Sequence, residues 1–252
     1  MARHGGGRGW YGKLLGAALG VTVLATGASV WTAQAGETDE ASPAVRAPAV
    51  RAVSASIAHA SQGGRGAINL TIDDGPDPKW TPRVLELLRQ YRVKATFCMV
   101  GTQARAHPDL VRRVVAEGHR LCDHSVSHNT AMDKESEAYQ SRQILDAERM
   151  ITRASGGVRP QYYRAPGGAF TPFSRKLAAS RGMRPLGWNV DSKDFERPGV
   201  GVIVATVERE LSGGPTVLFH DAGGDRSQTL EALRRLLPGL RQQGHTFSFP
   251  VR

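Results

Sequence analysis

The alternation of short apolar runs with longer amphipathic stretches, from residue 67 to residue 249, most constrains how this chain folds. The apolar runs are typical of strands and lie at 67–72, 95–100, 119–122, 161–163, 216–219 and 246–249. The stretches between them repeat apolar residues at helical spacing, at 81–91, 107–117, 135–154, 171–181, 202–211 and 227–243. Strands that alternate with helices build a parallel sheet. Six or seven such units are too few for a closed eightfold barrel, so we expect an α/β fold, a distorted (β/α) barrel with about seven parallel strands.

The first 35 of the 252 residues have the features of an export signal. Three basic residues precede an apolar run from Leu14 to Trp31, and small residues at Ala33 and Ala35 form a signal-peptidase site. We expect a secretory signal peptide over residues 1–35, cleaved after Ala35. The alternative is an uncleaved membrane anchor, since the apolar run is just long enough to span a bilayer. Under either interpretation the rest of the chain lies outside the cytoplasm.

Residues 36–66 are rich in Ala, Ser, Pro and Gly, so the sequence predicts a flexible linker there and a folded domain over residues 67–252.

Without residues 1–35, which carry three Lys or Arg and no acidic residue, the formal charge falls from +10 to +7. A basic exported protein suits an anionic surface such as a cell wall, and a GC-rich genome that favours arginine explains the charge equally well. No basic stretch is interleaved with aromatic residues, so we expect no nucleic-acid partner.

Ionisable residues cluster where the predicted strands end, which is where parallel β/α folds place their chemistry. They are Asp73 and Asp74 after 67–72, His124 and His128 after 119–122, Arg164 after 161–163, Asp191 before the helix at 202–211, and His220 after 216–219. Each fragment has a simpler explanation when taken alone, because Asp-Asp-Gly-Pro is a common turn sequence and most His-x-x-x-His pairs are incidental. Their joint placement at strand ends predicts one site.

The side chains at this predicted site are those of metal-dependent hydrolysis. Imidazoles four residues apart share a helix face, so His124 and His128 point the same way and need one carboxylate to complete a three-ligand metal site. Three protein ligands leave a position open for water, which is typical of a catalytic site. Asp73 and Asp74 diverge along the strand, so one can bind the metal while the other accepts a proton.

Two further roles complete this chemistry. His220 is a candidate proton donor to the leaving group, and Asp191 is a candidate for raising the pKa of His220. A nearby guanidinium would relieve the repulsion between two adjacent carboxylates and keep the free one ionised.

Five motifs in order resemble those of the polysaccharide deacetylases of carbohydrate esterase family four, which have a NodB-like domain. They read TIDDGP (71–76), HSVSH (124–128), RAPGG (164–168), DSKDF (191–195) and LFH (218–220), and the resemblance extends over about residues 67–249. It implies a distorted (β/α) barrel that removes N- or O-linked acetyl groups from sugars with a divalent metal, most simply Zn²⁺, with Co²⁺ as an alternative. By position the resemblance implies that Asp74, His124 and His128 are metal ligands. It implies that Asp73 is a general base held by Arg164, and that His220 is a general acid with Asp191 as its partner. It also implies that the Gly167 N–H donates to the oxyanion and that Leu218 forms a wall of the acetyl pocket.

Two positions depart from the family pattern. Phe195 stands where the fourth motif usually ends in Trp, so the apolar wall beside the substrate is kept and an indole N–H is lost. Gly167 stands where an aromatic residue commonly follows the proline, so the backbone donor is kept and a sugar-stacking face is lost. Neither departure changes a metal ligand or a proton-transfer group, so the resemblance still implies an active enzyme.

Cys98 and Cys122 fall in two predicted strands that should be neighbours. Adjacent strands lie about 5 Å apart, near the Cα separation that a disulfide needs. Outside the cytoplasm we expect either a disulfide between them or two buried free thiols. A third interpretation, Cys122 as a metal ligand, is disfavoured because the Asp-His-His set already fills the site.

Three classes of function remain open from the sequence. They are an extracytoplasmic deacetylase of peptidoglycan, chitin oligomers or xylan, a hydrolase of a non-sugar amide, and a catalytically silent glycan-binding module. The intact base, ligand set and acid argue against the third class, whereas the first two differ in cleft shape. We expect a secreted, cell-wall-associated monomer whose partner is polysaccharide, with no membrane contact beyond the leader.

Overall fold

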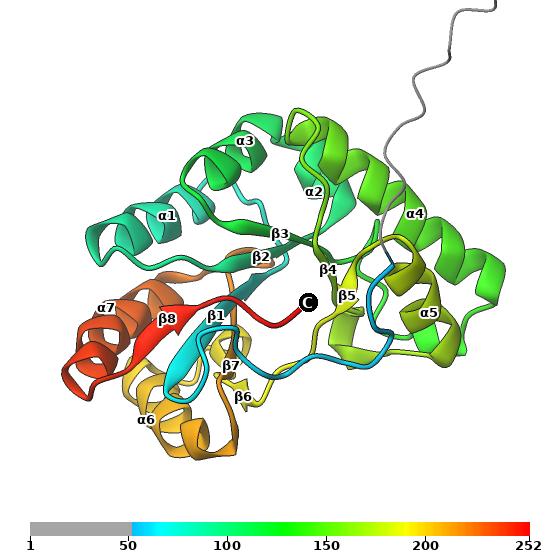
Figure 1. Cartoon of the computed structure of the whole chain (residues 1–252). Helices are drawn as coiled ribbons and strands as arrows, with labels where there is room; N and C mark the ends of the chain where they lie inside the picture. The colour runs from blue at the N-terminus through cyan, green and yellow to red at the C-terminus, as the bar shows by residue number, and fades with distance from the viewer. Residues whose placement is uncertain (1–51) are drawn as a thin grey trace, which may run out of the picture. The chain divides into compact units, whose positions relative to one another are not determined.

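A computed structural model describes residues 52–252 (Figure 1). Eight strands form one sheet in the order β5-β4-β3-β2-β1-β7-β6, with β8 paired to β1 beside this path, and every pairing is parallel. The strands are β1 (Ala67–Asp73), β2 (Thr96–Met99), β3 (Arg120–Asp123), β4 (Tyr162–Tyr163), β5 (Arg184–Pro185), β6 (Val190–Asp191), β7 (Thr216–His220) and β8 (Thr246–Ser248). The α-helices are α1 (Thr81–Gln90), α2 (Gly101–Ala106), α3 (Pro108–Ala116), α4 (Glu137–Ala154), α5 (Pro172–Ser180), α6 (Val200–Glu210) and α7 (Ser227–Gln242).

Strand β1 lies inside the sheet, where it pairs with β2, β7 and β8, and all seven of its residues are buried. A parallel strand that is covered on both faces reads as a nearly continuous apolar run, as AINLTI does. Apolar side chains of α1 and α7, among them Val84, Leu88, Leu233 and Leu237, belong to the same core cluster as those of β1. This packing fixes β1 and therefore the position of the carboxylates at its end.

Helix starts follow local sequence signals. Prolines stand in the first turns of α1, α3 and α5, where the missing backbone N–H costs no intrahelical hydrogen bond. Helix α5 also has a capping box, in which Thr171 and Ser174 each accept a hydrogen bond from the other's backbone N–H. The bounds of the six predicted helices agree with the structure to within two residues.

The sheet curls into an open barrel, and Figure 1 shows the helices around the outside of the strands. Strands β5 and β6 are the two ends of the path, and within residues 52–252 no pairing between them closes it. The predicted α/β fold, a distorted (β/α) barrel with about seven parallel strands, is confirmed.

The segment before β1 is packed on the domain. The backbone of Ala58 pairs with that of Leu186, directly after β5, and Ser61 pairs with Pro250. The hydroxyl of Thr216 donates to the carbonyl of His59 at 2.7 Å. The prediction of a flexible linker is therefore wrong for residues 52–66, because small residues that cannot form their own core can still add backbone hydrogen bonds to an existing sheet.

The other N-terminal predictions are not addressed by this part of the chain. The predicted signal peptide or anchor (1–35) and the rest of the predicted linker (36–51) lie outside the described residues. Within residues 52–252, none of the helices combines the length and the apolar character needed to cross a membrane.

A disulfide joins Cys98 of β2 to Cys122 of β3. The two residues are register partners in neighbouring parallel strands, their Cα atoms are 4.1 Å apart, and both side chains are fully buried. The bond closes a loop with a sequence separation of 24 residues directly behind the strand end that carries His124.

We expect no reactive thiol in the denatured, unreduced protein and two after reduction. Reduction should also lower the free energy of unfolding by about 3 kcal/mol, because a loop of this size then regains its freedom in the unfolded chain. Thiol titration in denaturant and urea unfolding with and without reductant measure the two effects. Two reactive thiols before reduction would show that the cysteines are free.

Candidate active site and metal centre

A cavity of about 640 Å³ opens at the C-terminal ends of β1, β3, β4, β6 and β7. All ten residues that the sequence predicted for catalysis, substrate and metal line it, namely Asp73, Asp74, His124, His128, Arg164, Gly167, Asp191, Phe195, Leu218 and His220. Residues that are up to 147 positions apart in sequence are thus brought to one place by the parallel sheet. Cys122 is in the disulfide, so it is not a ligand.

Asp74, His124 and His128 form a cluster in which one ligand atom of each lies within 4.8 Å of the others. The Oδ1 atom of Asp74 is 3.1 Å from Nε2 of His128 and 3.6 Å from Nε2 of His124. The Nδ1 atom of His124 is 2.8 Å from the carbonyl oxygen of Arg164, so this nitrogen carries the proton and donates it. The lone pair of His124 Nε2 is then directed at the cluster, as metal binding requires.

The two histidines converge for a reason other than the predicted one. The segment from His124 to Asn129 is a loop, so the four-residue spacing does not place them on a helix face. Ser125 and His128 adopt the left-handed backbone conformation, with φ of 66° and 57°. The Ser125 hydroxyl also accepts a hydrogen bond from the backbone N–H of His128 at 3.1 Å, which turns the second imidazole back toward the first.

The protonation of Asp74 and His124 fits a divalent cation, whereas the contact with Asp74 raises the pKa of His128. Burial acts to raise the pKa of Asp74, but the imidazoles of His128 and His124, whose Nε2 atoms lie 3.1 and 3.6 Å from Oδ1, outweigh it and lower the pKa to about 2. Burial lowers the pKa of His124, against the charges of Asp73 and Asp74, and so favours its neutral form. The buried Asp74 Oδ1 also accepts no hydrogen bond. An ionised oxygen without a donor beside a neutral imidazole is a donor set suited to a metal such as Zn²⁺.

Arg164 holds the second carboxylate in place. Its side chain is completely buried, and Nη1 donates to Asp73 Oδ1 at 2.6 Å and to the Thr71 hydroxyl at 3.0 Å. Nε and Nη2 donate to the carbonyls of Leu186 and Gly187 at 3.1 and 2.9 Å. The other oxygen of Asp73, Oδ2, lies 3.6 Å from His124 Nε2 and beside the cluster. The two adjacent carboxylates therefore have different partners, a guanidinium for Asp73 and imidazoles for Asp74.

The carboxylate that contacts His220 is Asp194, which corrects the prediction of Asp191. Asp194 Oδ1 is 2.7 Å from His220 Nδ1, and Asp194 Oδ2 accepts from the backbone N–H of His220 at 3.0 Å and from the Thr229 hydroxyl at 2.7 Å. Asp191 ends β6 and instead pairs with Lys193 at 2.8 Å. The motif DSKDF contains two aspartates, and only the second contacts His220, because the one-turn 3₁₀ helix η3 (Asp194–Glu196) places it there.

Asp194 changes the titration of His220. Burial acts to lower the pKa of His220, but the hydrogen bond to Asp194 and the charge of that carboxylate outweigh it and raise the pKa to about 9. His220 is thereby kept protonated near neutral pH. A protonated imidazole in the cavity is a suitable general acid.

Apolar and aromatic groups form the remaining walls. Leu218 is buried at the end of β7, and Phe195 is half exposed with its ring 5.2 Å from that of His220. Gly167 has φ of 60° and lies in the 3₁₀ helix η2 (Pro166–Gly168), where a Cβ would come within 3.3 Å of Thr130. Trp188, which the sequence analysis did not identify, is half-buried in the wall, with the Arg164 guanidinium 5.6 Å from its ring.

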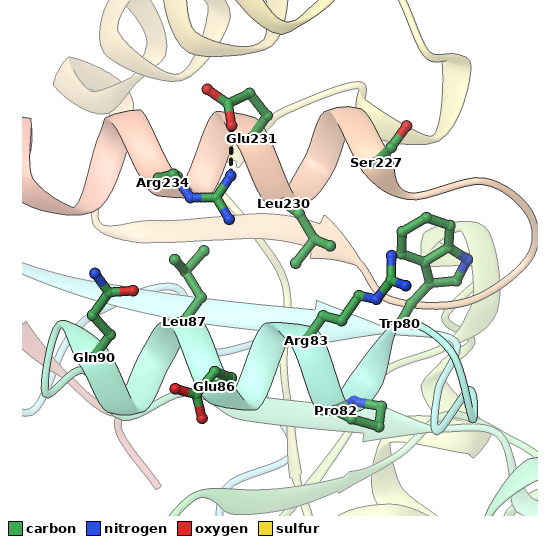
Figure 2. A pocket seen from close by; sticks show the side chains of 10 residues that line it. All are labelled: Trp80, Pro82, Arg83, Glu86, Leu87, Gln90, Ser227, Leu230, Glu231 and Arg234. Atoms are coloured by element: carbon green, nitrogen blue, oxygen red, sulfur yellow. Dashed lines mark hydrogen bonds and ion pairs between the residues drawn. The ribbon is translucent and has the colours of Figure 1, made fainter.

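A second groove lies away from these residues, between α1 and α7 (Figure 2). Its floor is apolar, from Leu87 and Leu230, and its rim carries charges of both signs, including the ion pair between Glu231 and Arg234 at 2.6 Å. None of the predicted site residues lines it. Within residues 52–252, the groups predicted for catalysis and metal binding therefore lie in the cavity at the strand ends and not in this groove.

Comparison with known proteins agrees with this geometry. The family model described as polysaccharide deacetylase matches residues 60–186. A peptidoglycan-N-acetylglucosamine deacetylase of Bacillus cereus is 40% identical over 182 residues, which are 71% of this chain and 84% of that protein. The chain belongs to the polysaccharide deacetylase family.

Two further similarities support this assignment. A chitooligosaccharide deacetylase of Bradyrhizobium is 38% identical over 192 residues, covering 72% of this chain and 87% of the relative. The solved structure of the Bc1960 peptidoglycan N-acetylglucosamine deacetylase superposes with a TM-score of 0.72 at 30% identity, over 77% of this chain and 90% of that one. The chain is thus an enzyme, a hydrolase of the deacetylase type, with the fold of this family.

In this deacetylase we expect Asp194→Asn to move the alkaline limb of the kcat/KM profile to lower pH. A general acid works while protonated, so a raised pKa extends activity upward in pH and activity is lost as pH rises through it. Without the Asp194 charge, the loss should begin well below pH 9. Asp191→Asn is the matched control and should leave the limb in place. A limb that moves only in the Asp191 variant would contradict the assignment of Asp194.

Proposed function

We propose that this deacetylase removes acetyl groups from N-acetylated extracellular polysaccharide, such as peptidoglycan or chitin-type oligomers, with a divalent metal, most simply Zn²⁺. The observation that carries the proposal is the convergence of three metal-ligand side chains, a carboxylate base and an imidazolium acid in one cavity. The similarity to peptidoglycan and chitooligosaccharide deacetylases supports an N-acetyl substrate. Every group of the proposed site comes from one chain, which is compatible with a monomer.

Asp73 is the proposed general base. Its Oδ1 is held by Arg164, so Oδ2 is the oxygen left to accept a proton from the attacking water. Asp74, His124 and His128 would hold the metal. When bound, a divalent metal supplies Lewis-acid polarisation of the acetyl carbonyl and acidifies a water molecule. Asp73 and Asp74 thus divide base catalysis and metal binding between two adjacent residues.

His220 is the proposed general acid. Its Nδ1 is engaged with Asp194, which leaves Nε2 as the nitrogen that can donate a proton to the departing amine. The fixed backbone N–H of Gly167 would stabilise the negative oxygen that forms on the acetyl carbon. Leu218 would contact the acetyl methyl, and Phe195 and Trp188 would line the sugar site, so that Trp188 supplies the aromatic face that Gly167 lacks.

We further propose that the enzyme acts outside the cytoplasm, at the cell wall. The basic and apolar leader of residues 1–35 supports export. The disulfide between Cys98 and Cys122 supports an oxidising compartment, because such bonds are rare in reducing cytosol.

The proposal is tested by acetate release from peptidoglycan, N-acetylated chitooligomers and acetylxylan, assayed side by side. We expect release from the N-acetylated substrates with added Zn²⁺ or Co²⁺, loss after exhaustive chelation, and recovery when metal returns. Asp74→Ala should lower both metal content and turnover to background, whereas Asp109→Ala, at an exposed carboxylate of α3, should keep both.

Two outcomes would contradict the proposal. Turnover that survives exhaustive chelation, or persists in Asp74→Ala, would exclude the metal role of this cluster. Release from acetylxylan alone would make the enzyme an O-acetyl esterase.

A further inference from the structure

Arg226 lines the active-site cavity and has no role in the chemistry described above. It precedes α7, and its side chain is only 4% exposed. Its Nε donates to the carbonyl of Ala222 at 2.6 Å, which fixes the plane of the guanidinium. Within residues 52–252, its two terminal nitrogens make no hydrogen bond and no ion pair.

The other charged groups around the cavity are paired. Asp73 is paired with Arg164, Asp191 with Lys193, and Asp194 with His220, while Asp74 belongs to the metal cluster. Among the described residues that line the cavity, Arg226 is the permanent cation without a carboxylate within 4 Å. Burying an unpaired charge is costly, so a protein normally pairs it or keeps it for a ligand.

Gly223 keeps the approach to this guanidinium open. It has φ of 77°, and a Cβ there would lie 3.2 Å from Nη2 of Arg226 and 3.5 Å from Oδ2 of Asp74. A side chain at position 223 would therefore fill the space between the guanidinium and the metal cluster. Glycine leaves that space to a ligand that reaches both.

We propose that Arg226 binds an anionic substituent, a carboxylate or a phosphate, carried by the glycan close to the acetyl group that is removed. The planar fork of a guanidinium matches the oxygens of either group, and Nη1 and Nη2 are both available for this contact. This role of Arg226 rests on the proposed deacetylation, and it makes the preferred substrate of the enzyme an acidic rather than a neutral N-acetylated glycan. A neutral chitin oligomer would leave the guanidinium buried and unpaired.

The test compares three glycans: peptide-free peptidoglycan strands, whose lactyl groups carry free carboxylates, a 6-phosphorylated N-acetylglucosamine oligomer, and a neutral chitooligomer of the same length. The full enzyme with its metal is compared with Arg226→Met and Arg226→Lys. Arg197→Met is the matched control, since it removes an equal charge from an exposed position in the η3–α6 loop. Acetate release gives KM and kcat, and calorimetry gives binding of the same glycans.

We expect the wild-type enzyme to prefer an anionic glycan to the neutral one, and we expect this preference to appear as a lower KM for the anionic glycan. Arg226→Met should lower the ratio of kcat/KM for anionic over neutral glycan by about tenfold or more, as expected for lost hydrogen bonds to a charged group. Arg226→Lys should keep part of the preference, and Arg197→Met all of it. Whichever of the two anionic glycans the wild type prefers, the one with carboxylates or the one with phosphates, identifies the anion that Arg226 binds.

An equal ratio in wild type and Arg226→Met would overturn the inference while leaving deacetylation intact. A rise in the inhibition constant of acetate, without a change in that ratio, would also overturn it, because the anion would then be the product. If wild type releases acetate from none of the glycans, the proposed function fails, and calorimetry still decides the role of Arg226. In that calorimetry, equal affinity of wild type and Arg226→Met for the anionic glycans would overturn the proposed role of Arg226.

Discussion

The buried contact between Arg164 and Asp73 organises the rest of the site. The guanidinium donates hydrogen bonds to Asp73 and to Thr71, which lies two residues earlier in β1. It also donates to two carbonyls of the segment between β5 and β6. The carbonyl of the same residue accepts from His124 and so fixes which nitrogen of that ring faces the metal cluster. One arginine thus sets the base on β1 and the ligand that follows β3. Truncating it would leave a buried carboxylate without its partner, which is costly in free energy.

The site separates four carboxylates by their partners. Asp73 has a guanidinium, Asp74 has two imidazoles, Asp194 has the imidazole of His220, and Asp191 has an ammonium at the rim. Because each partner favours a different protonation state or ligand, similar side chains take different roles within one cavity. The parallel sheet makes this possible, since its strands all end at the same edge and each end contributes one or two groups.

The sequence was sufficient for the parts of the molecule that have periodicity or specific motifs. Helices of nine residues or more were located closely, because their apolar spacing is repeated over several turns. Strands β5 and β6 have two residues each and α2 has six, and they were missed because such short elements show no period. Strand β4 is equally short, but it lies within the predicted strand at 161–163. Residues 52–66 were misjudged because composition does not reveal backbone pairing with another segment.

At the site, motif positions were predicted better than the contacts within them. His124 and His128 were correctly grouped, yet loop residues with positive φ, and not a helix face, bring them together. The choice between Asp191 and Asp194 depends on a single turn of 3₁₀ helix that places one of two aspartates against His220. Such a turn leaves no periodic signal in the sequence, and neither does the burial of Arg226, which depends on the folded loop between β7 and α7.

Anomalous diffraction at the zinc absorption edge, from crystals of the protein grown with Zn²⁺, would locate the metal and identify its ligands. We expect one strong peak at about 2.0–2.2 Å from Asp74 Oδ1, His124 Nε2 and His128 Nε2, with Asp73 beside it and hydrogen-bonded to Arg164. A peak held by other residues, or no peak at these three at saturating Zn²⁺, would show that Asp74, His124 and His128 do not form the metal site.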